Sequence, residues 1–355
     1  MQAGDCALFL IDGVDGIKVQ TEQGWEYAKE LNLPSVIFIN KLDRERSDFN
    51  RTLNEAREIS DPKPIIVQLP IGKETGFKGI VDLARMKAYT YDANGKASEI
   101  DIPDDMKDTV EAEREAFIEN VAESDDALIE RYLEGEELTD EDIREALKKG
   151  LLSRTFAPVL CGSATANIGI DLLLDFIVGT FPSPADRGAF TATDELGKSA
   201  VTCAPDPSEP FAGLVVKTVA DPYAGRLTIF RVVSGTLGSD GTFYNVNKDT
   251  RERFNQLMTI AGKEQKPAKE AVPGSIVAVA KLKETTTGDT LCAENRKIKI
   301  TCLEPMPTLI SYALTAKAKG DEDKIFGGLT KLMEEDMGLK LDRNAETKEI
   351  LLSGA

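Results

Sequence analysis

The chain has no histidine, and this absence excludes several classes of chemistry. General-base catalysis by imidazole, Ser-His triads and metal sites built on histidine need a side chain that none of the 355 positions supplies. Cysteine is scarce as well: the five present are scattered and never form Cys-x-x-Cys, which favours reduced thiols over a disulfide framework or a zinc site. The sequence therefore gives us no catalytic residue and no metal ligand to assign.

Long hydrophobic runs are missing too. The longest apolar stretches, such as CALFLI and LLLDFIV, fall far short of a membrane span, and no signal peptide opens the chain. We therefore expect a cytoplasmic protein without a membrane partner. With 41% hydrophobic residues the chain can still bury more than one core, and its length suggests two or three domains.

Positive charge is in short supply. The formal net charge of −18 argues against non-specific binding of nucleic acid by the whole surface, and we expect no DNA partner. The acid is concentrated in residues 99–149, where 20 Asp and Glu face 6 Lys and Arg, a local balance of −14. This segment is either a solvated helical face or a surface that attracts a basic partner.

A loop that grips phosphate is also absent from the sequence. A nucleoside triphosphate needs backbone N–H groups, a lysine and a hydroxyl for Mg²⁺, which Gly-x-x-x-x-Gly-Lys-Ser/Thr supplies, and no window of the chain matches this pattern. An Asp-x-x-Gly that would sense a γ-phosphate occurs as DELG (194–197). It does not follow a strand, so we interpret it as a chance match.

What is present begins with an α/β pattern. CALFLID (6–12) and SVIFIN (35–40) are buried-strand candidates, and the stretch between them has helical spacing at Trp25, Ala28 and Leu31. Such a unit is normally parallel and right-handed. PIIVQLPIG (64–72) and APVLCGSA (157–164) predict further strands, and the helix after them should stop at Pro182 and Pro184.

The remaining segments predict an ordered series of parts. Residues 1–66 and 156–184 form a partial α/β domain, interrupted at 67–155 by an acidic α+β insertion with a hairpin turn at Asn94-Gly95. In the insertion, Thr139 should cap a helix with Asp142, which buries Ile143, Ala146 and Leu147. The other predicted parts are a connector (185–210), an antiparallel β-barrel (211–303) and half of a two-layer α+β domain (304–355).

The strand SVIFIN ends in Asn40-Lys41-Leu42-Asp43, at the edge where an open α/β sheet presents its binding loops. A carboxylate at Asp43 can accept two hydrogen bonds from the N1–H and 2-amino groups of guanine, a pair that adenine lacks. Lys41 can lay its stem over the ring, and Asn40 can brace the loop. The alternative is a strand end whose Asn and Asp merely cap the next helix.

CGSA (161–164) is a second candidate element, because it follows a strand of the same sheet. The backbone N–H groups of Ser163 and Ala164 could bond the guanine O6, although Gly-Ser-Ala is also ordinary loop composition. Asp12 and Asp15, in LIDGVDG, are interpreted as turn residues rather than catalytic ones.

Taken together, these segments resemble bacterial elongation factor G, and the resemblance covers essentially the whole chain in order. The segments that carry it are DCALFLIDGVDGIKVQTEQGWEYAKELNLPSVIFINKLDRERSDF, IERYLEGEELTDEDIREAL, ADPYAGRLTIFRVVSGTL, GSIVAVAKLKETTTGDTLC and GDEDKIFGGLTKLMEEDMGLKLDRNAETKEILLSG. The resemblance looks nearer to the elongation-factor-G-like paralogues than to the main factor. It implies a partial P-loop-type GTPase domain with the inserted subdomain, then a barrel, then half of a ferredoxin-like domain.

The resemblance also implies function. It assigns guanine contacts to Asn40, Lys41, Asp43, Ser163 and Ala164, although Thr165 and Ala166 depart from the bulky or basic residues usual there. GTP or GDP with Mg²⁺ would be the cofactor of the intact family member. The family's phosphate loop, switches and catalytic histidine would precede residue 1 and further domains would follow Ala355. We therefore expect a fragment that holds no nucleotide tightly and does not hydrolyse GTP by itself.

The implied partners are ribosomal. The barrel would pack on RNA and proteins of the small subunit, with Lys217, Arg226, Arg231 and Lys248 as candidate phosphate contacts or ordinary solvated side chains. The acidic insertion would bind the C-terminal domain of the stalk protein. The leading hypothesis is a piece of a ribosome-dependent translational GTPase that serves translocation. The alternatives are a non-hydrolysing ribosome- or stalk-binding module, or a recycling, release or ribosome-protection relative.

Overall fold

The computed structural model describes residues 1–136, 138–221, 225–305, 307–316, 320–344 and 349–354. The chain divides into two compact units at Arg187 and Gly188. Each has its own hydrophobic core and is described by itself. Among the described residues, no helix is long and apolar enough to cross a bilayer.

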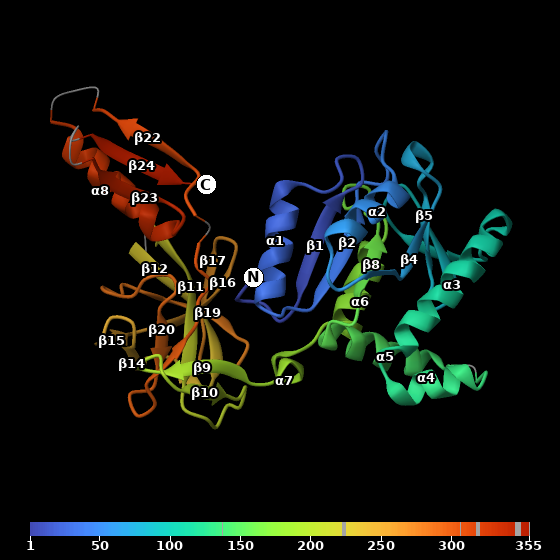
Figure 1. Ribbon diagram of the computed structural model, residues 1–355. Helices are drawn as coiled ribbons and strands as arrows, with labels where there is room; N and C mark the ends of the chain where they lie inside the picture. The colour runs from blue at the N-terminus through green and yellow to red at the C-terminus, as the bar shows by residue number, and fades with distance from the viewer. Residues whose placement is uncertain (137, 222–224, 306, 317–319, 345–348, 355) are drawn as a thin grey trace. The chain divides into compact units, whose positions relative to one another are not determined.

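Four parallel strands form the main sheet of the first unit, in the order β1-β2-β8-β3. Figure 1 labels three of them, β1, β2 and β8. They are β1 (Ala7–Asp12), β2 (Ser35–Asn40), β3 (Pro64–Ile66) and β8 (Ala157–Cys161). The two central strands, β2 and β8, are buried almost throughout. This burial explains their near-continuous apolar sequences, because both faces of a parallel sheet are covered. The α/β prediction is confirmed.

Three helices accompany this sheet: α1 (Val19–Glu30), α2 (Phe49–Ile59) and α6 (Ile170–Thr180). As predicted, α1 buries Trp25 and Ala28 against the core, whereas the predicted Leu31 lies just past the end of the helix and is only partly buried. The predicted stop of the last helix is also confirmed, because α6 ends just before Pro182, whose ring would clash with another helical turn.

The predicted single strand at 64–72 is in fact two strands in two sheets. β3 completes the parallel sheet, and β4 (Gln68–Ile71) begins an antiparallel sheet of the insertion, in the order β4-β5-β6-β7. Its other strands are β5 (Gly79–Asp82), β6 (Lys87–Tyr91) and β7 (Ala97–Ile100). The β6–β7 hairpin turns at Asn94-Gly95 as predicted, with Gly95 at a positive φ of 74°.

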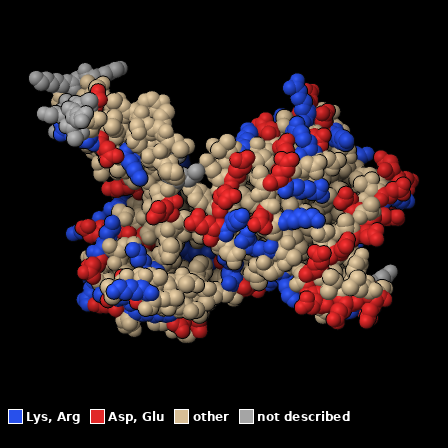
Figure 2. Space-filling view, in the orientation of Figure 1, with Lys and Arg blue, Asp and Glu red and all other residues tan. Residues whose placement is uncertain are grey.

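The helical half of the insertion is acidic. It consists of α3 (Lys107–Ala122), α4 (Asp126–Leu133) and α5 (Asp140–Ser153), with short 3₁₀ turns η1 (Glu74–Gly76) and η2 (Asp104–Met106) nearby. Thr139 caps α5 in a reciprocal pair with Asp142, and the predicted apolar face is buried. Figure 2 shows acidic side chains gathered over these helices.

The second unit opens with structure where a connector was expected. After α7 (Pro184–Arg187), which ends the first unit, residues 188–210 include the strands β9 (Phe190–Asp194) and β10 (Ala200–Cys203). These two strands form a hairpin, and β9 also pairs with β21 (Ile298–Ile300). The Asp-x-x-Gly at 194–197 is the turn of this hairpin. Asp194 accepts the N–H groups of Lys198 (2.8 Å) and Ser199 (3.1 Å), which gives the match a structural explanation.

A curled antiparallel sheet forms the predicted barrel domain, in the order β15-β14-β20-β11-β12-β19-β16-β17, with the small pair β13-β18 beside it. The strands are β11 (Ala212–Asp221), β12 (Gly225–Ser234), β13 (Leu237–Gly238), β14 (Gly241–Asn245), β15 (Thr250–Phe254), β16 (Leu257–Ala261), β17 (Glu264–Pro267), β18 (Glu270–Ala271), β19 (Ile276–Ala280) and β20 (Thr290–Cys292). Phe230, Phe243 and Phe254 pack in its core.

The last part has the predicted order of one strand, one helix and two strands. It comprises β22 (Ile310–Leu314), α8 (Glu322–Glu335), β23 (Lys340–Arg343) and β24 (Ile350–Gly354), with the sheet order β22-β24-β23. The middle of the predicted hairpin, residues 345–348, lies outside the described residues.

Candidate functional site

The two predicted guanine-binding loops meet at the carboxyl edge of the parallel sheet. Asp12 of β1 pairs in register with Asn40 of β2, and Ile39 pairs with Cys161 of β8. Parallel strands end on the same side, so the loops that follow them converge there. The sheet thus brings residues 40–43 beside residues 162–164, as the sequence pattern predicts.

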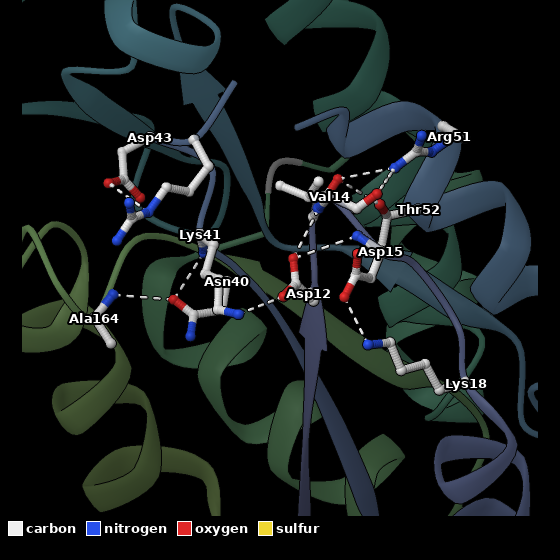
Figure 3. Close-up of polar contacts among 12 residues, drawn as sticks. Asp12, Val14, Asp15, Lys18, Asn40, Lys41, Asp43, Arg51, Thr52 and Ala164 are labelled. Atoms are coloured by element: carbon white, nitrogen blue, oxygen red, sulfur yellow. Dashed lines mark hydrogen bonds and ion pairs between the residues drawn. The ribbon is translucent and has the colours of Figure 1, made fainter. Parts of the chain in front are cut away.

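Asn40 joins these two loops through one amide oxygen. Its Oδ1 accepts the N–H of Lys41 (2.8 Å) and, 124 residues further along the chain, the N–H of Ala164 (3.0 Å) (Figure 3). The backbone N–H of Leu42 also donates to the carbonyl of Gly162 (3.3 Å). The predicted bracing role of Asn40 therefore has a direct structural basis.

Lys41 adopts an uncommon backbone conformation for a residue with a side chain, with φ at 64°. Its Nζ lies 2.5 Å from Oδ2 of Asp12. Asp12 is a turn residue as well, since its Oδ1 accepts the N–H groups of Val14 (2.9 Å) and Asp15 (3.4 Å). Burial raises the pKa of Asp12, but the hydrogen bond from Lys41 and the two from the turn outweigh it and hold this pKa below the ordinary value.

Asp43 has hydrogen-bonding capacity that the protein does not use. Its Oδ1 is buried and has no hydrogen-bond partner. Its Oδ2 lies 3.8 Å from Nε of Arg44, which is ion-pair distance but too long for a hydrogen bond. A buried acceptor without a donor is costly, so a ligand with two adjacent N–H donors would fit this carboxylate.

In the second loop, backbone N–H groups that the sequence suggested were free for a base already donate to acceptors within the protein. The N–H of Ser163 donates to the carbonyl of Ile168 (3.0 Å), and its hydroxyl accepts the N–H of Ala166 (3.2 Å). Ser163 is fully buried by this turn. The N–H of Ala164, at an exposed position, is held by Asn40. A guanine O6 would therefore have to share or replace Asn40 at Ala164, and Ser163 shapes the turn from within.

The insertion contacts both of these loops. Oε1 of Glu74 accepts the N–H of Arg46 (2.9 Å), in the loop that follows Asp43. On the other side, Nδ2 of Asn167 donates to the carbonyl of Gly95 (3.4 Å), in the β6–β7 turn. A subdomain inserted between the third and fourth strands of the parallel sheet in chain order thus supports the edge of that sheet.

An open pocket of about 630 Å³ lies at this edge, lined in part by Asp12, Lys41, Asp43 and Thr75. Within the described residues, no group of three or more Cys, Asp or Glu is placed to hold a metal ion. The five cysteines are free. The residues at the pocket offer a carboxylate with one unpartnered oxygen and a lysine, a set suited to a polar heterocycle.

Comparison with known proteins supplies the family. Residues 1–183 match the profile of the elongation factor Tu GTP binding domain, 210–294 that of elongation factor G domain 2, and 305–355 that of elongation factor G, domain III. Elongation factor G from two strains of Ureaplasma parvum serovar 3 is 38% identical over 354 residues, 99% of this chain. This chain belongs to the elongation factor G family.

The match to elongation factor G relatives spans only part of them. The chain covers about half the length of the Ureaplasma proteins, 51%. A crystal structure of a protein from Thermus thermophilus superposes with a TM-score of 0.85 at 29% identity, over 99% of this chain and 50% of that one. The order of parts predicted from the sequence is therefore the order found in this family.

Two of the four basic residues suggested for RNA contact are engaged inside the protein. Arg231 is only 1% exposed, and its guanidinium lies 5.2 Å from the ring of Phe190, so the expectation of a solvated or RNA-facing side chain is wrong. Arg226 donates to the carbonyls of Lys283 (3.1 Å) and Thr285 (2.6 Å). Lys217 and Lys248 are exposed.

Sequence reasoning missed the contribution of Asp12 to the site and that of Glu74 entirely. Asp12 was interpreted only as a turn residue, although its place at the end of the strand beside β2 could have signalled a contact with Lys41. No local pattern marks Glu74, because its partner Arg46 lies 28 residues away.

Proposed function

We propose that this chain carries the guanine-recognition part of an elongation factor G-type GTP site. The observation that carries the proposal is the buried, unpartnered Oδ1 of Asp43, next to a loop that Asn40 already braces. The N1–H and 2-amino groups of guanine would donate to the two oxygens of this carboxylate. The ring face would rest on the stem of Lys41, and O6 would compete for the N–H of Ala164.

Hydrolysis is a separate matter. The 355 residues contain neither the phosphate-loop pattern nor a histidine, so we propose that this chain by itself reads the base but does not hydrolyse GTP. In a site with phosphate contacts, bound Mg²⁺ would neutralise phosphate charge. The residues described at the pocket suit the base of a nucleotide.

Calorimetric or ligand-observed NMR titration tests this proposal. We expect guanosine and GDP to bind with similar, weak affinity and adenosine to bind more weakly still, because only the base is recognised. Micromolar GDP binding far tighter than guanosine binding, or GTP turnover by the chain, would contradict the proposal that this chain reads only the base. Equal binding of guanosine and adenosine would contradict base recognition itself.

Asp43→Asn gives the sharpest variant. Its amide would present one acceptor and one donor, which suits the N1–H and 2-oxo groups of xanthine in place of the two donors of guanine. We expect guanosine binding to weaken about tenfold or more and xanthosine binding to gain, since an unpaired polar contact is heavily penalised.

Asp48→Asn is the matched control for that exchange. Asp48 lies in the same loop and caps α2 by accepting the N–H of Arg51 (2.9 Å), a role that Asn fills equally well. Its variant should keep the wild-type order of bases. If both variants prefer guanosine as the wild type does, Asp43 does not read the base.

We propose that the chain serves protein synthesis in the cytoplasm, in the translocation step on the ribosome. A ribosome- or stalk-binding module without hydrolysis remains the second candidate, favoured by the acidic helices of the insertion (Figure 2). A recycling, release or ribosome-protection role is the third. Binding of the chain to the stalk protein's C-terminal domain, with and without guanine nucleotide, separates the module hypothesis from the GTP-site hypothesis.

A further inference from the structure

The Lys41 side chain of the proposed guanine site is 48% exposed. A lysine stem that is free in solvent loses rotamer entropy when a ligand immobilises it. A protein group that already holds the ammonium lowers that cost before the ligand arrives. Only a group on a neighbouring element can do so without occupying the place of the base.

Asp12 meets this requirement. It ends β1, directly opposite Asn40 in the register, and its Oδ2 holds the Lys41 ammonium at 2.5 Å. Its side chain is 19% exposed and is itself fixed, because Oδ1 accepts two N–H groups of the following turn. The two carboxylate oxygens therefore do different things, one shaping the turn and the other holding the lysine.

The location of the Asp12–Lys41 ion pair indicates which part of the lysine it positions. Lys41 starts from a backbone with positive φ in the loop after β2 and ends at Asp12 on β1. Its stem therefore runs along the carboxyl edge of the sheet, between Asp12 and the side where Asn40, Asp43 and Ala164 lie (Figure 3). Both Asp12 and Asp43 line the same open pocket, on which Lys41 also borders.

We propose that Asp12 is a positioning residue of the guanine site, which holds the Lys41 ammonium so that the lysine stem forms a preset face for the base. The inference rests on the proposed guanine recognition and deepens it. Asp12 does not touch the base. It acts through Lys41, and its loss should leave the hydrogen bonds of Asp43 to guanine available but weaken binding through a mobile lysine.

Asp12→Asn separates the two roles of this side chain. The Asn oxygen can still accept the N–H groups of Val14 and Asp15, so the turn is retained, but its amide nitrogen cannot hold an ammonium. We expect guanosine and GDP to bind about threefold to fivefold more weakly, the range that a half-exposed ion pair can supply. Xanthosine should remain a poor ligand, because Asp43 is unchanged.

A double-mutant cycle with Lys41→Met shows whether Asp12 acts through the lysine. Met keeps an apolar stem and removes the charge. If the inference holds, adding Asp12→Asn to Lys41→Met changes guanosine affinity no further. A purely structural role of Asp12 predicts the same loss in both backgrounds, and that result would overturn the inference.

Asp125→Asn is the matched control. Asp125 has the same two contacts in the insertion, with Oδ1 accepting the N–H of Ala127 (3.0 Å) and Oδ2 at 2.6 Å from Nζ of Lys149. We expect its variant to bind guanosine as the wild type does. Wild-type affinity in Asp12→Asn overturns this inference alone, whereas a wild-type chain that does not prefer guanosine overturns the proposed function and this inference together.

Discussion

At the scale of single residues, polar groups buried in this protein set the geometry of its loops. Asn40 does so at the candidate site, where one oxygen connects two loops that are distant in sequence. Glu252 does so in the barrel. It is 7% exposed, and its carboxylate accepts the N–H groups of Lys283 (2.5 Å), Glu284 (3.1 Å) and Thr285 (3.0 Å), together with the Thr285 hydroxyl.

These contacts make Glu252 a pH-sensitive support of the barrel. Burial raises the pKa of Glu252, but the hydrogen bond from the Thr285 hydroxyl and those from the backbone N–H groups lower it to a net value below the ordinary one. A carboxyl whose folded-state pKa is depressed stabilises the fold above its unfolded pKa. That contribution is complete above the unfolded-state pKa of a glutamate, about 4.3, and is lost as the pH falls below this value and through the lower folded-state pKa.

We expect Glu252→Gln to lower the free energy of unfolding by about 2 kcal/mol near pH 7, because a neutral amide replaces a charged acceptor of several hydrogen bonds. The difference from the wild type should shrink as the pH falls below about 4. Urea unfolding at pH 7 and at pH 3.5 measures both effects. Glu264→Gln, at an exposed position of β17, is the control and should change neither.

At the scale of elements, the inserted subdomain contacts a loop at the carboxyl edge of the parallel sheet. The hydrogen bond from the N–H of Arg46 to Glu74 ties the loop after Asp43 to η1. Both residues have positive φ, 65° for Arg46 and 49° for Glu74, so the contact joins two conformations that side chains rarely adopt. Such conformations persist where surrounding contacts hold them.

We therefore expect Glu74→Ala to loosen the loop of residues 43–48. Amide hydrogen exchange of Arg46 should quicken, and guanosine binding should weaken a few-fold because Asp43 would be less well ordered. Glu99→Ala is the control, since Glu99 pairs with Lys87 (3.0 Å) elsewhere in the same subdomain. Unchanged exchange at Arg46 would show that the loop is held without the insertion.

At the scale of the whole chain, the distribution of charge is the dominant feature. Glu111, Glu115 and Glu119 are all exposed and recur every four residues along α3. Like charges at this spacing destabilise a helix slightly, by a few tenths of a kcal/mol per pair. A stripe of this kind is suited to steering a basic partner.

Replacing these three glutamates with glutamine should slow association with the basic C-terminal domain of the stalk protein several-fold at low salt. The dissociation rate should change little, because long-range charge acts on encounter more than on the bound complex. The difference should fade at high salt. Stopped-flow or surface-based kinetics at two salt concentrations measure both rates.

A control with the same geometry exists on α1. Glu22, Glu26 and Glu30 are exposed and have the same spacing, so their triple glutamine variant removes the same charge from another helix. If both variants slow association equally, the net charge of the chain controls the association rate, and the position of the acidic residues on the insertion does not. If neither does, the proposed contact with the stalk protein is wrong.

Patterns within short segments predicted much of this fold. Two parallel strands, the α1 core positions, the Asn94-Gly95 turn and the Thr139 cap all follow from residue spacing over a few positions. The same is true of the placement of Asn40-Lys41-Leu42-Asp43 at a strand end. Local sequence suffices here because each feature depends on neighbours in the chain.

Other features required the folded chain. The division of residues 64–72 between two sheets and the strands inside 185–210 depend on which distant strands are available for pairing. The burial of Arg231 likewise follows from packing in the barrel rather than from its sequence neighbours. A basic residue in a strand pattern gives no sign of which face it will occupy.

By itself, the sequence determined the order of parts, the acidic segment and the guanine-type motif, because these depend on residue identity and short spacing. Only the tertiary structure decided which contacts the residues of that motif and its neighbouring loop make. It gave Lys41 a partner in Asp12, left Asp43 with an unused acceptor and gave the N–H of Ala164 to Asn40. The two contacts made by Lys41 and Ala164 span 29 and 124 residues, so they exist only once parallel strands align their ends at one edge.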